Sequence, residues 1–81
     1  MSYFVYIVEC SDNTLYTGIA TDVERRLDEH NNSDKGAKYT KIRRPVKLVY
    51  SEVQEDRSSA SKREHAIKKL TRNEKLDLIN A

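Results

Sequence analysis

The distribution of apolar residues along the chain predicts three β-strands. Residues 3–10 (YFVYIVEC) carry apolar side chains at both odd and even positions, which is typical of a strand covered on both faces. Turn-forming residues at 11–14 (SDNT) lead into a second short strand at 15–20 (LYTGIA), so the first twenty residues predict a β-hairpin. Apolar and polar residues alternate again at 46–53 (VKLVYSEV), which predicts the third strand.

A helix is predicted directly after the hairpin. Thr21 and Glu24 stand three residues apart just before an apolar-periodic run, which is the spacing of a capping box, and the helix should continue to about Asn31. The following stretch, 31–45 (NNSDKGAKYTKIRRP), is expected to be irregular or briefly helical and is closed by Pro45. One helix and one loop therefore separate the hairpin from the third strand.

Two further helices are predicted after the third strand. Asp56 or Ser58 can cap a helix that continues through Leu70. Thr71 and Glu74 repeat the capping-box spacing and start a short last helix toward residue 79. The order β-β-α-(α)-β-α-α predicts an α/β (α+β) fold in which a small three-stranded antiparallel sheet is flanked by helices.

Length and composition narrow the class of protein. A chain of 81 residues is large enough for one small core, so residues 1–81 are expected to form a single domain. Cys10 is the only cysteine, which excludes an internal disulfide and favours a reducing compartment. No apolar run approaches the roughly 20 residues that span a bilayer, and the start lacks the pattern of a signal peptide. We therefore expect a cytoplasmic protein that has no membrane partner.

The net charge of +2 conceals a strong asymmetry between the two parts of the chain. Residues 1–34 hold two basic and seven acidic side chains, whereas residues 35–81 hold thirteen basic and six acidic ones. A basic half of this kind is the electrostatic footprint of a protein that meets nucleic acid phosphates. The alternative is a solvated surface whose charges balance in three dimensions, and charge alone does not choose between the two.

Two charged residues lie beside the apolar stripe of the first predicted helix. Val23 and Leu27 are four residues apart and must form this stripe. Arg26 lies three residues from Val23, and His30 lies three from Leu27, so both side chains border the core. A guanidinium in this position needs acceptors, which are carboxylates or carbonyls inside a protein and phosphate oxygens at a ligand-binding cleft.

The helix that is predicted to end at Leu70 also has a charged residue beside its apolar core, and here the charge is negative. Ala60, Ile67 and Leu70 mark its apolar stripe, and Glu64 falls inside that stripe. Burial of an unpaired carboxylate costs several kcal/mol, so Glu64 needs a cation as its partner. One alternative is a buried ion pair with Arg26. The other is a cleft in which Glu64 binds a hard metal cation and the arginine binds phosphate.

Three segments of the chain resemble the conserved elements of the GIY-YIG nuclease superfamily. VYIVECSDNTLYTG resembles its paired GIY and YIG elements, DVERRLDEH its arginine-bearing helix, and KREHAIKKL its glutamate-bearing helix. GIY is here FVY, and YIG is YTG with Thr17, which removes no chemically active side chain. The stretch 30–52 further resembles the small single-domain YhbQ-like bacterial group and the catalytic domain of a structure-specific endonuclease. The matching functional positions are Tyr6, Tyr16, Gly18, Arg26, His30 and Glu64.

The resemblance implies a metal-dependent endonuclease that hydrolyses DNA phosphodiester bonds, with flaps, nicks or branched DNA in repair or recombination as possible substrates. Glu64 would hold one divalent metal ion, Mg²⁺ or Mn²⁺, and Arg26 would neutralise the transition-state phosphorane. Tyr6 or Tyr16 would act as general base or orient the attacking water. A free tyrosine has a pKa of about 10, so the metal, Arg26 or His30 would have to lower it. His30 is the competing base, because a free histidine titrates near neutrality.

The two tyrosines can act together only if they lie on the same face of the hairpin. This requires that paired residue numbers sum to an even value, or that a bulge intervenes. The resemblance gives Gly18 a structural place in the same element.

A basic segment between the first helix and the third strand is a candidate for nucleic acid binding. Basic side chains can follow a phosphate backbone while an aromatic ring stacks on a base. A solvated loop is the alternative, and its tyrosine could instead belong to the catalytic pocket. The candidate residues are Lys35, Lys38, Tyr39, Lys41, Arg43 and Arg44.

A second class of function remains open from the sequence. The chain could be a nucleic-acid-binding module that cleaves little alone and acts within a complex. Because 81 residues leave no room for a separate DNA-recognition domain, substrate choice would come from its own surface or from a targeting protein partner. Retention of Glu64 favours the nuclease, since a binding module needs a basic surface but not this carboxylate.

Overall fold

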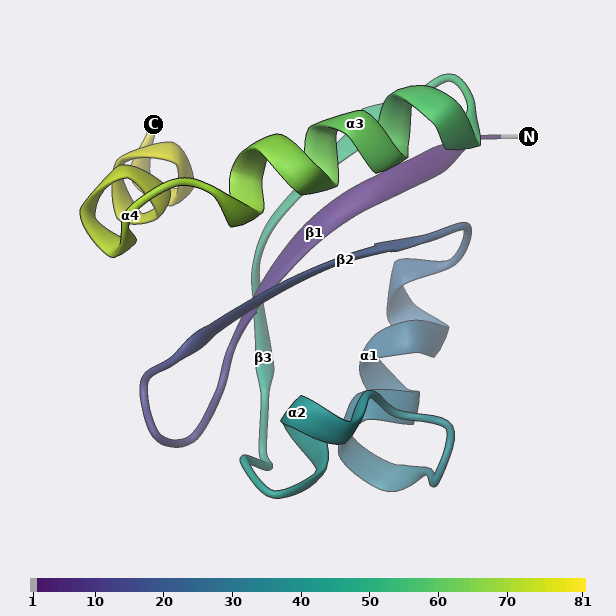
Figure 1. Cartoon of the computed structure of the whole chain (residues 1–81). Helices are drawn as coiled ribbons and strands as arrows, with labels where there is room; N and C mark the ends of the chain where they lie inside the picture. The colour runs from purple at the N-terminus through teal and green to yellow at the C-terminus, as the bar shows by residue number, and fades with distance from the viewer. Residues whose placement is uncertain (1) are drawn as a thin grey trace.

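The central feature of the computed structural model, which describes residues 2–81, is a three-stranded antiparallel sheet (Figure 1). Its strands are β1 (Tyr3–Glu9), β2 (Leu15–Ala20) and β3 (Lys47–Gln54), in the order β2-β1-β3. The predicted fold class is confirmed. The first strand ends one residue earlier and the third lies one residue later than predicted.

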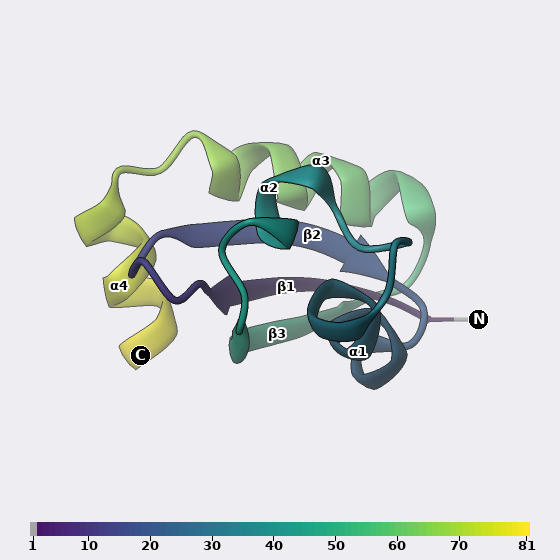
Figure 2. The same ribbon diagram turned by 90° about the horizontal axis from the view of Figure 1, so that it is seen from below.

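Four helices surround the sheet. They are α1 (Val23–Asn32), α2 (Lys38–Lys41), α3 (Arg57–Lys68) and α4 (Arg72–Asn80). Figure 2 shows α1 and α2 in front of the sheet and α3 behind it, beside β2. The element order confirms the prediction, including the brief helix that follows α1. None of the helices in this described part of the chain combines the length and apolar character needed to cross a membrane.

The first helix begins one residue later than the capping-box spacing indicated. Asp22, not Thr21, is the N-cap, and its carboxylate accepts a hydrogen bond of 3.0 Å from the backbone N–H of Arg25. The predicted box between Thr21 and Glu24 is therefore wrong. Asp and Thr are both good N-cap residues, and the adjacent aspartate takes this position here.

The other two helix starts follow the sequence signals. Asp56, rather than Ser58, caps α3, and its carboxylate accepts from the Ser59 backbone N–H at 2.8 Å. Thr71 and Glu74 form the predicted capping box at the start of α4. Helix α3 ends at Lys68, two residues before the predicted end, since the chain must turn there to start α4.

Apolar side chains form a core layer on each face of the sheet, as the pattern of β1 predicted. Odd-numbered residues of β1 contact α3 and α4, and even-numbered ones contact α1. The first layer is built around Val5, Ile7, Ala60 and Ile67. The second is built around Tyr6, Val8, Cys10 and Val46, with Val23 and Leu27 of α1 against it.

The buried hydroxyl of Thr17 gives a testable stability prediction. Thr17 is 3% exposed, pairs with Ile7 of β1, and finds no hydrogen-bond partner for its Oγ1 among the described residues. Thr17→Val keeps the branched shape and removes the unpaired hydroxyl, so it should raise the free energy of unfolding by about 1 kcal/mol. Urea denaturation checks this, with Thr17→Ser as the control that keeps the hydroxyl and loses a methyl group. A less stable Thr17→Val protein would contradict the expectation.

Candidate active site

The register of the hairpin places both candidate tyrosines on one face of the sheet. Tyr6 pairs with Gly18 and Val8 pairs with Tyr16, so paired residue numbers sum to an even value without a bulge. Within the described part of the chain, the register shift in the β1 pairings lies on the other side, between Ile7 and Val8 against β3. The predicted same-face arrangement is confirmed.

Gly18 makes room for the ring of Tyr6. A Cβ atom at position 18 would lie 2.5 Å from the Tyr6 hydroxyl oxygen and 2.7 Å from Cζ. Both distances are shorter than real Cβ contacts allow. The ring therefore lies across the glycine of the neighbouring strand, where Tyr6 is 2% exposed. This contact explains why the site needs glycine here, and no positive φ angle is involved.

A chain of hydrogen bonds runs inward from the Tyr6 hydroxyl. Tyr6 Oη lies 2.7 Å from Nε2 of His30, which is fully buried, and His30 Nδ1 lies 2.9 Å from Thr40 Oγ1. Thr40 donates its single hydroxyl proton to the Ala37 carbonyl at 2.9 Å. The Ala37 backbone N–H also donates to His30 Nδ1 at 3.4 Å, so the two ring nitrogens of His30 together contact Tyr6, Thr40 and Ala37. Sequence analysis missed Thr40, because no local pattern marks a polar residue of a short helix as the partner of a distant histidine.

Burial shifts both ends of the Tyr6–His30 hydrogen bond away from ionisation. It raises the pKa of Tyr6 to about 12, although the nearby Arg26 acts in the opposite direction. Burial also lowers the pKa of His30 to about 4, and the positive charge of Arg26 adds to this effect. The expectations of a lowered tyrosine pKa and a near-neutral histidine are therefore wrong for this pair. At neutral pH a protonated tyrosine is hydrogen-bonded to a neutral imidazole.

The buried His30 should make the stability of the fold depend on pH. Its pKa is about 4 when folded, against an ordinary value of 6.5, so below pH 6.5 the unfolded chain binds a proton that the folded chain does not. The stabilisation is fully present above pH 6.5 and falls as the pH drops toward 4. Between pH 7 and 5.5 the loss should be about 1 kcal/mol. Urea denaturation at several pH values measures it.

The control for this pH dependence is His30→Gln. The variant should be less stable overall, but its free energy of unfolding should vary much less between pH 7 and 5.5. Carboxylates with lowered pKa values, such as those of Glu52 and Asp56, lose their contribution only below their ordinary values of 4.5 and 3.8, outside this window. Equal slopes in the two proteins would show that His30 is not the cause.

Aromatic rings continue from His30 to the surface. The Tyr16 ring meets His30 edge to face at 5.4 Å and stacks on Tyr39 at 5.8 Å. The guanidinium of Arg43 lies over the Tyr39 ring, 3.9 Å from its centroid. Tyr39, 38% exposed, therefore lies on the wall of this site, which was one of its two predicted places.

Arg26 and Glu64 do not form the buried ion pair that was one sequence-based alternative. Arg26 Nη1 lies 3.0 Å from Glu29 Oε1 and donates to the Lys35 carbonyl at 2.8 Å. Glu64 Oε2 lies 3.3 Å from the Nζ of Lys68, and no contact joins it to Arg26 within the described residues. Both groups are nevertheless close enough to Tyr6 to act on its pKa in opposite directions. The two charges therefore act on the same tyrosine without forming an ion pair with each other.

Glu64 is the candidate carboxylate ligand for a metal ion in this site, because its charge acts on Tyr6. Within residues 2–81 there is no group of three or more His, Cys, Asp or Glu side chains able to hold a metal. Mg²⁺ is commonly bound by one or two carboxylates together with water and substrate phosphate oxygens. The half-buried Glu64 fits an ion that is completed by substrate, provided that its contact with Lys68 opens.

The predicted nucleic-acid-binding segment is divided by the structure. Arg44 donates to the carbonyls of His30 at 2.6 Å and Ser33 at 2.5 Å, and so caps the C-terminal end of α1. Arg43 forms an ion pair of 3.1 Å with Asp12. These arginines hold the loop in place. The lysines of the segment are exposed, namely Lys35, Lys38 and Lys41.

Comparison with known proteins gives one family over almost the whole chain. The model of the GIY-YIG catalytic domain matches residues 2–77. The UPF0213 protein of Desulfotalea psychrophila is 60% identical over 80 residues, covering 99% of this chain and 73% of the relative. A UPF0213 protein of Staphylococcus aureus is 60% identical over 78 residues, covering 96% of this chain and 94% of the relative.

Two structures solved by NMR share this fold. A protein from E. faecalis has a TM-score of 0.68 at 46% identity, covering 99% of this chain and 84% of its own. The UPF0213 protein of Bacillus halodurans has a TM-score of 0.63 at 42% identity with the same coverage. The likeness thus extends over the helices on both faces of the sheet as well as the hairpin.

Proposed function

Because the chain belongs to the GIY-YIG catalytic-domain family, we propose that residues 1–81 act as one nuclease domain, a metal-dependent endonuclease that hydrolyses DNA phosphodiester bonds. One observation carries the proposal. The Tyr6 hydroxyl lies across Gly18, is hydrogen-bonded to a buried neutral imidazole, and stands within electrostatic reach of both a guanidinium and a carboxylate. A purely structural tyrosine needs a hydrogen-bond partner, but it does not need charges of both signs.

Glu64 would hold the metal ion. A bound Mg²⁺ or Mn²⁺ supplies Lewis-acid stabilisation of the scissile phosphate and of the departing oxygen. Glu64 stands at the edge of α3 with a side chain that is 23% exposed, and its contact with Lys68 is a simple helix-surface pair. Substrate and metal can therefore replace the lysine at little cost.

Arg26 would bind the phosphate. Its Nη1 is held by Glu29 and by the Lys35 carbonyl, which fixes the plane of the guanidinium. Planar guanidinium donors suit two oxygens of one phosphate and stabilise the charge that develops on it. Positioning by Glu29 is a feature that the sequence did not indicate.

Tyr6 and His30 would manage the proton of the attacking water. The water transfers its proton to Tyr6 Oη as the tyrosine proton passes to His30 Nε2, leaving a neutral tyrosine and an imidazolium. A phosphate on Arg26 assists this step, because it offsets the positive charge that helps to lower the pKa of His30. Tyr16, edge-on to the same imidazole, would line the water site.

The preferred substrates would be flaps, nicks or branched DNA, as in repair or recombination. The exposed lysines Lys35, Lys38 and Lys41, together with Tyr39 beside Tyr16, support contact with an accessible strand near the site. A targeting protein partner would supply further selectivity, and a cytoplasmic location agrees with a DNA substrate.

The test is cleavage of a panel of substrates by the purified protein. Supercoiled plasmid, nicked and flap duplexes, four-way junctions and the equivalent RNAs are each incubated with Mg²⁺, with Mn²⁺ and with chelator. A mock purification from cells that lack the gene gives the background. Metal-dependent cutting above this background supports the nuclease and identifies its substrate. Salt-sensitive binding without any cutting would instead favour a binding module that acts within a complex.

A further inference from the structure

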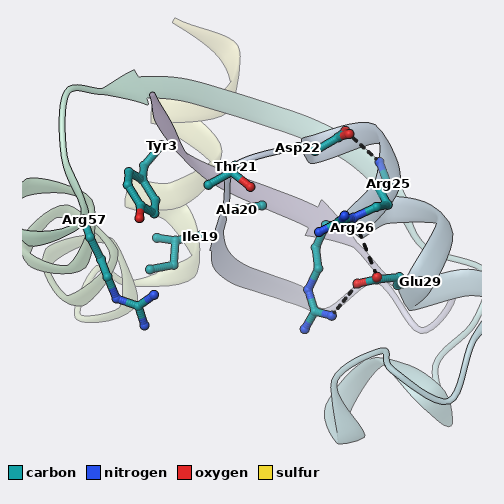
Figure 3. A pocket seen from close by; sticks show the side chains of 9 residues that line it. All are labelled: Tyr3, Ile19, Ala20, Thr21, Asp22, Arg25, Arg26, Glu29 and Arg57. Atoms are coloured by element: carbon teal, nitrogen blue, oxygen red, sulfur yellow. Dashed lines mark hydrogen bonds and ion pairs between the residues drawn. The ribbon is translucent and has the colours of Figure 1, made fainter. Parts of the chain in front are cut away.

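A cavity lined by three arginines lies next to the candidate active site. Its volume is about 240 Å³, and it is bounded by the start of β1, the end of β2 and the first residues of α1 and α3 (Figure 3). We call it the arginine pocket, and the residues that matter for the argument are Tyr3, Ile19, Arg25, Arg26, Glu29 and Arg57.

The charges of the arginine pocket are unbalanced in favour of an anion. Two carboxylates line it, but Asp22 is occupied as the N-cap of α1 and Glu29 pairs with Arg26 at 3.0 Å. Arg25 makes only a distant contact of 3.9 Å with Glu29, and its side chain is 71% exposed. Arg57 is exposed and has no ion pair with any residue from 2 to 81. Two guanidiniums are thus available to a ligand.

The arginine pocket lies beside the proposed reacting centre. Arg26 belongs to both, since it lines the pocket and acts on Tyr6. Along β2 the pocket begins at Ile19 and Ala20, and Ala20 is two residues, or about 7 Å, beyond Gly18 on the same face. Arg57 precedes Glu64 on α3 by seven residues, which is about two turns on the same side of the helix.

The shape of the pocket fits a strand better than an isolated ion. Figure 3 shows Arg57 and Arg26 extending to the same side of the cavity, with Ile19 between them and the Tyr3 ring above Ile19. The side chain of Arg25 is exposed, so the cavity is open to solvent on that side. A continuous polymer needs such an opening to pass through the site. Guanidinium groups bind the phosphate oxygens while an aromatic and an aliphatic side chain can contact a sugar or base.

We propose that the arginine pocket binds a second backbone phosphate of the substrate strand, one that flanks the scissile phosphate, through Arg57 and Arg25. This rests on the proposed function and extends it. Two anchored phosphates, one at Arg26 and one in the pocket, fix the direction in which the strand crosses the site. Arg57 and Arg25 are therefore binding residues that position the strand, and their loss should raise KM far more than it lowers kcat.

The first test measures DNA binding by fluorescence anisotropy in chelator, so that no cleavage occurs. Arg57→Gln and Arg25→Gln should each weaken binding of a labelled nicked duplex about tenfold at low salt. Each should also lower the slope of log K against log salt concentration by about 1, as expected for one lost phosphate contact. The matched control is Lys62→Gln, because Lys62 is an exposed cation on the same helix as Arg57 that does not line the arginine pocket. It should change neither quantity appreciably.

The second test locates the phosphate. Neutral methylphosphonate linkages are introduced one at a time along the labelled strand. For the wild-type protein, one linkage that flanks the cleavage position should cost more affinity than Arg57→Gln alone, because it removes the contacts of both Arg57 and Arg25. The same linkage should cost the Arg57→Gln protein less than the wild type, and the protein with both Arg57→Gln and Arg25→Gln almost nothing, since both contacts have already been lost.

The outcomes separate this inference from the proposed function. If Arg57→Gln and Arg25→Gln bind like Lys62→Gln, or if methylphosphonate costs are the same in wild type and variants, the arginine pocket is not a phosphate site. Metal-dependent cleavage by the wild type would then still support the nuclease. If the wild type neither binds nor cleaves any nucleic acid, both are overturned.

Discussion

Glu64→Gln should lower metal-dependent cleavage about a thousandfold while leaving the fold intact. The substitution is nearly isosteric and removes the carboxylate that acts on Tyr6 and that we propose as the metal ligand. Within residues 2–81 its ion-pair partner is Lys68 of the same helix, at 3.3 Å on the surface, and such a pair contributes less than about 1 kcal/mol to stability. Initial rates of cleavage at saturating Mn²⁺ give the first quantity, and urea denaturation gives the second.

Lys68→Gln is the matched control for Glu64. It breaks the same ion pair from the other side and leaves the carboxylate free, so cleavage should be retained and the Mn²⁺ requirement should shift to equal or lower concentrations. Full activity of Glu64→Gln would show that the metal is held elsewhere. Loss of activity in both variants would mean that the ion pair itself, rather than a metal ion, matters.

Gly18→Ala, unlike Glu64→Gln, should cause large losses in both stability and activity. A Cβ here would stand 2.5 Å from the Tyr6 hydroxyl oxygen, and Tyr6 is buried and held by His30 at 2.7 Å. The ring has to shift, which costs about 2 kcal/mol as overpacking. A displacement of the hydroxyl by about 1 Å should reduce cleavage about a hundredfold. Urea denaturation and single-turnover cleavage measure the two effects.

The sign of the change in the free energy of unfolding shows whether position 18 is in tight contact with Tyr6 or in open space. Gly18 has no positive φ, so alanine meets no backbone barrier, and in open space the substitution would stabilise the fold through the unfolded chain. The control places Gly18→Ala in a Tyr6→Leu background, where the shorter side chain removes the contact. There it should cost at least 1 kcal/mol less than in the wild type. Equal costs in both backgrounds would contradict the proposed contact.

The sequence was most reliable where neighbouring residues carry the signal. The apolar run of β1, the alternation in β3 and the capping box of Thr71 and Glu74 each depend on residues within a few positions of one another. The prediction failed by one residue at the start of α1, since Thr21 and Asp22 are both good caps and local spacing did not separate them.

For the candidate site, too, the sequence identified some features and missed others. The residue types at Tyr6, Arg26, His30 and Glu64 could be identified from their spacing and from the resemblance to a family. Their partners could not. Glu29 rather than Glu64 holds Arg26, and Thr40 orients His30 across ten residues of chain. The carbonyls at the end of α1 occupy Arg44, which the composition of its segment placed on a nucleic-acid surface.

By itself, then, the sequence determined the order of strands and helices, the two-sided burial of β1 and the set of polar residues available for chemistry. Only the tertiary structure decided which of them meet and in which protonation state. Local periodicity and caps are set by spacing along the chain, whereas desolvation depends on what packs around a group from elsewhere. Tyr6 with its pKa raised to about 12, and His30 with its pKa lowered to about 4, owe those values to helices and strands that the chain brings together only on folding.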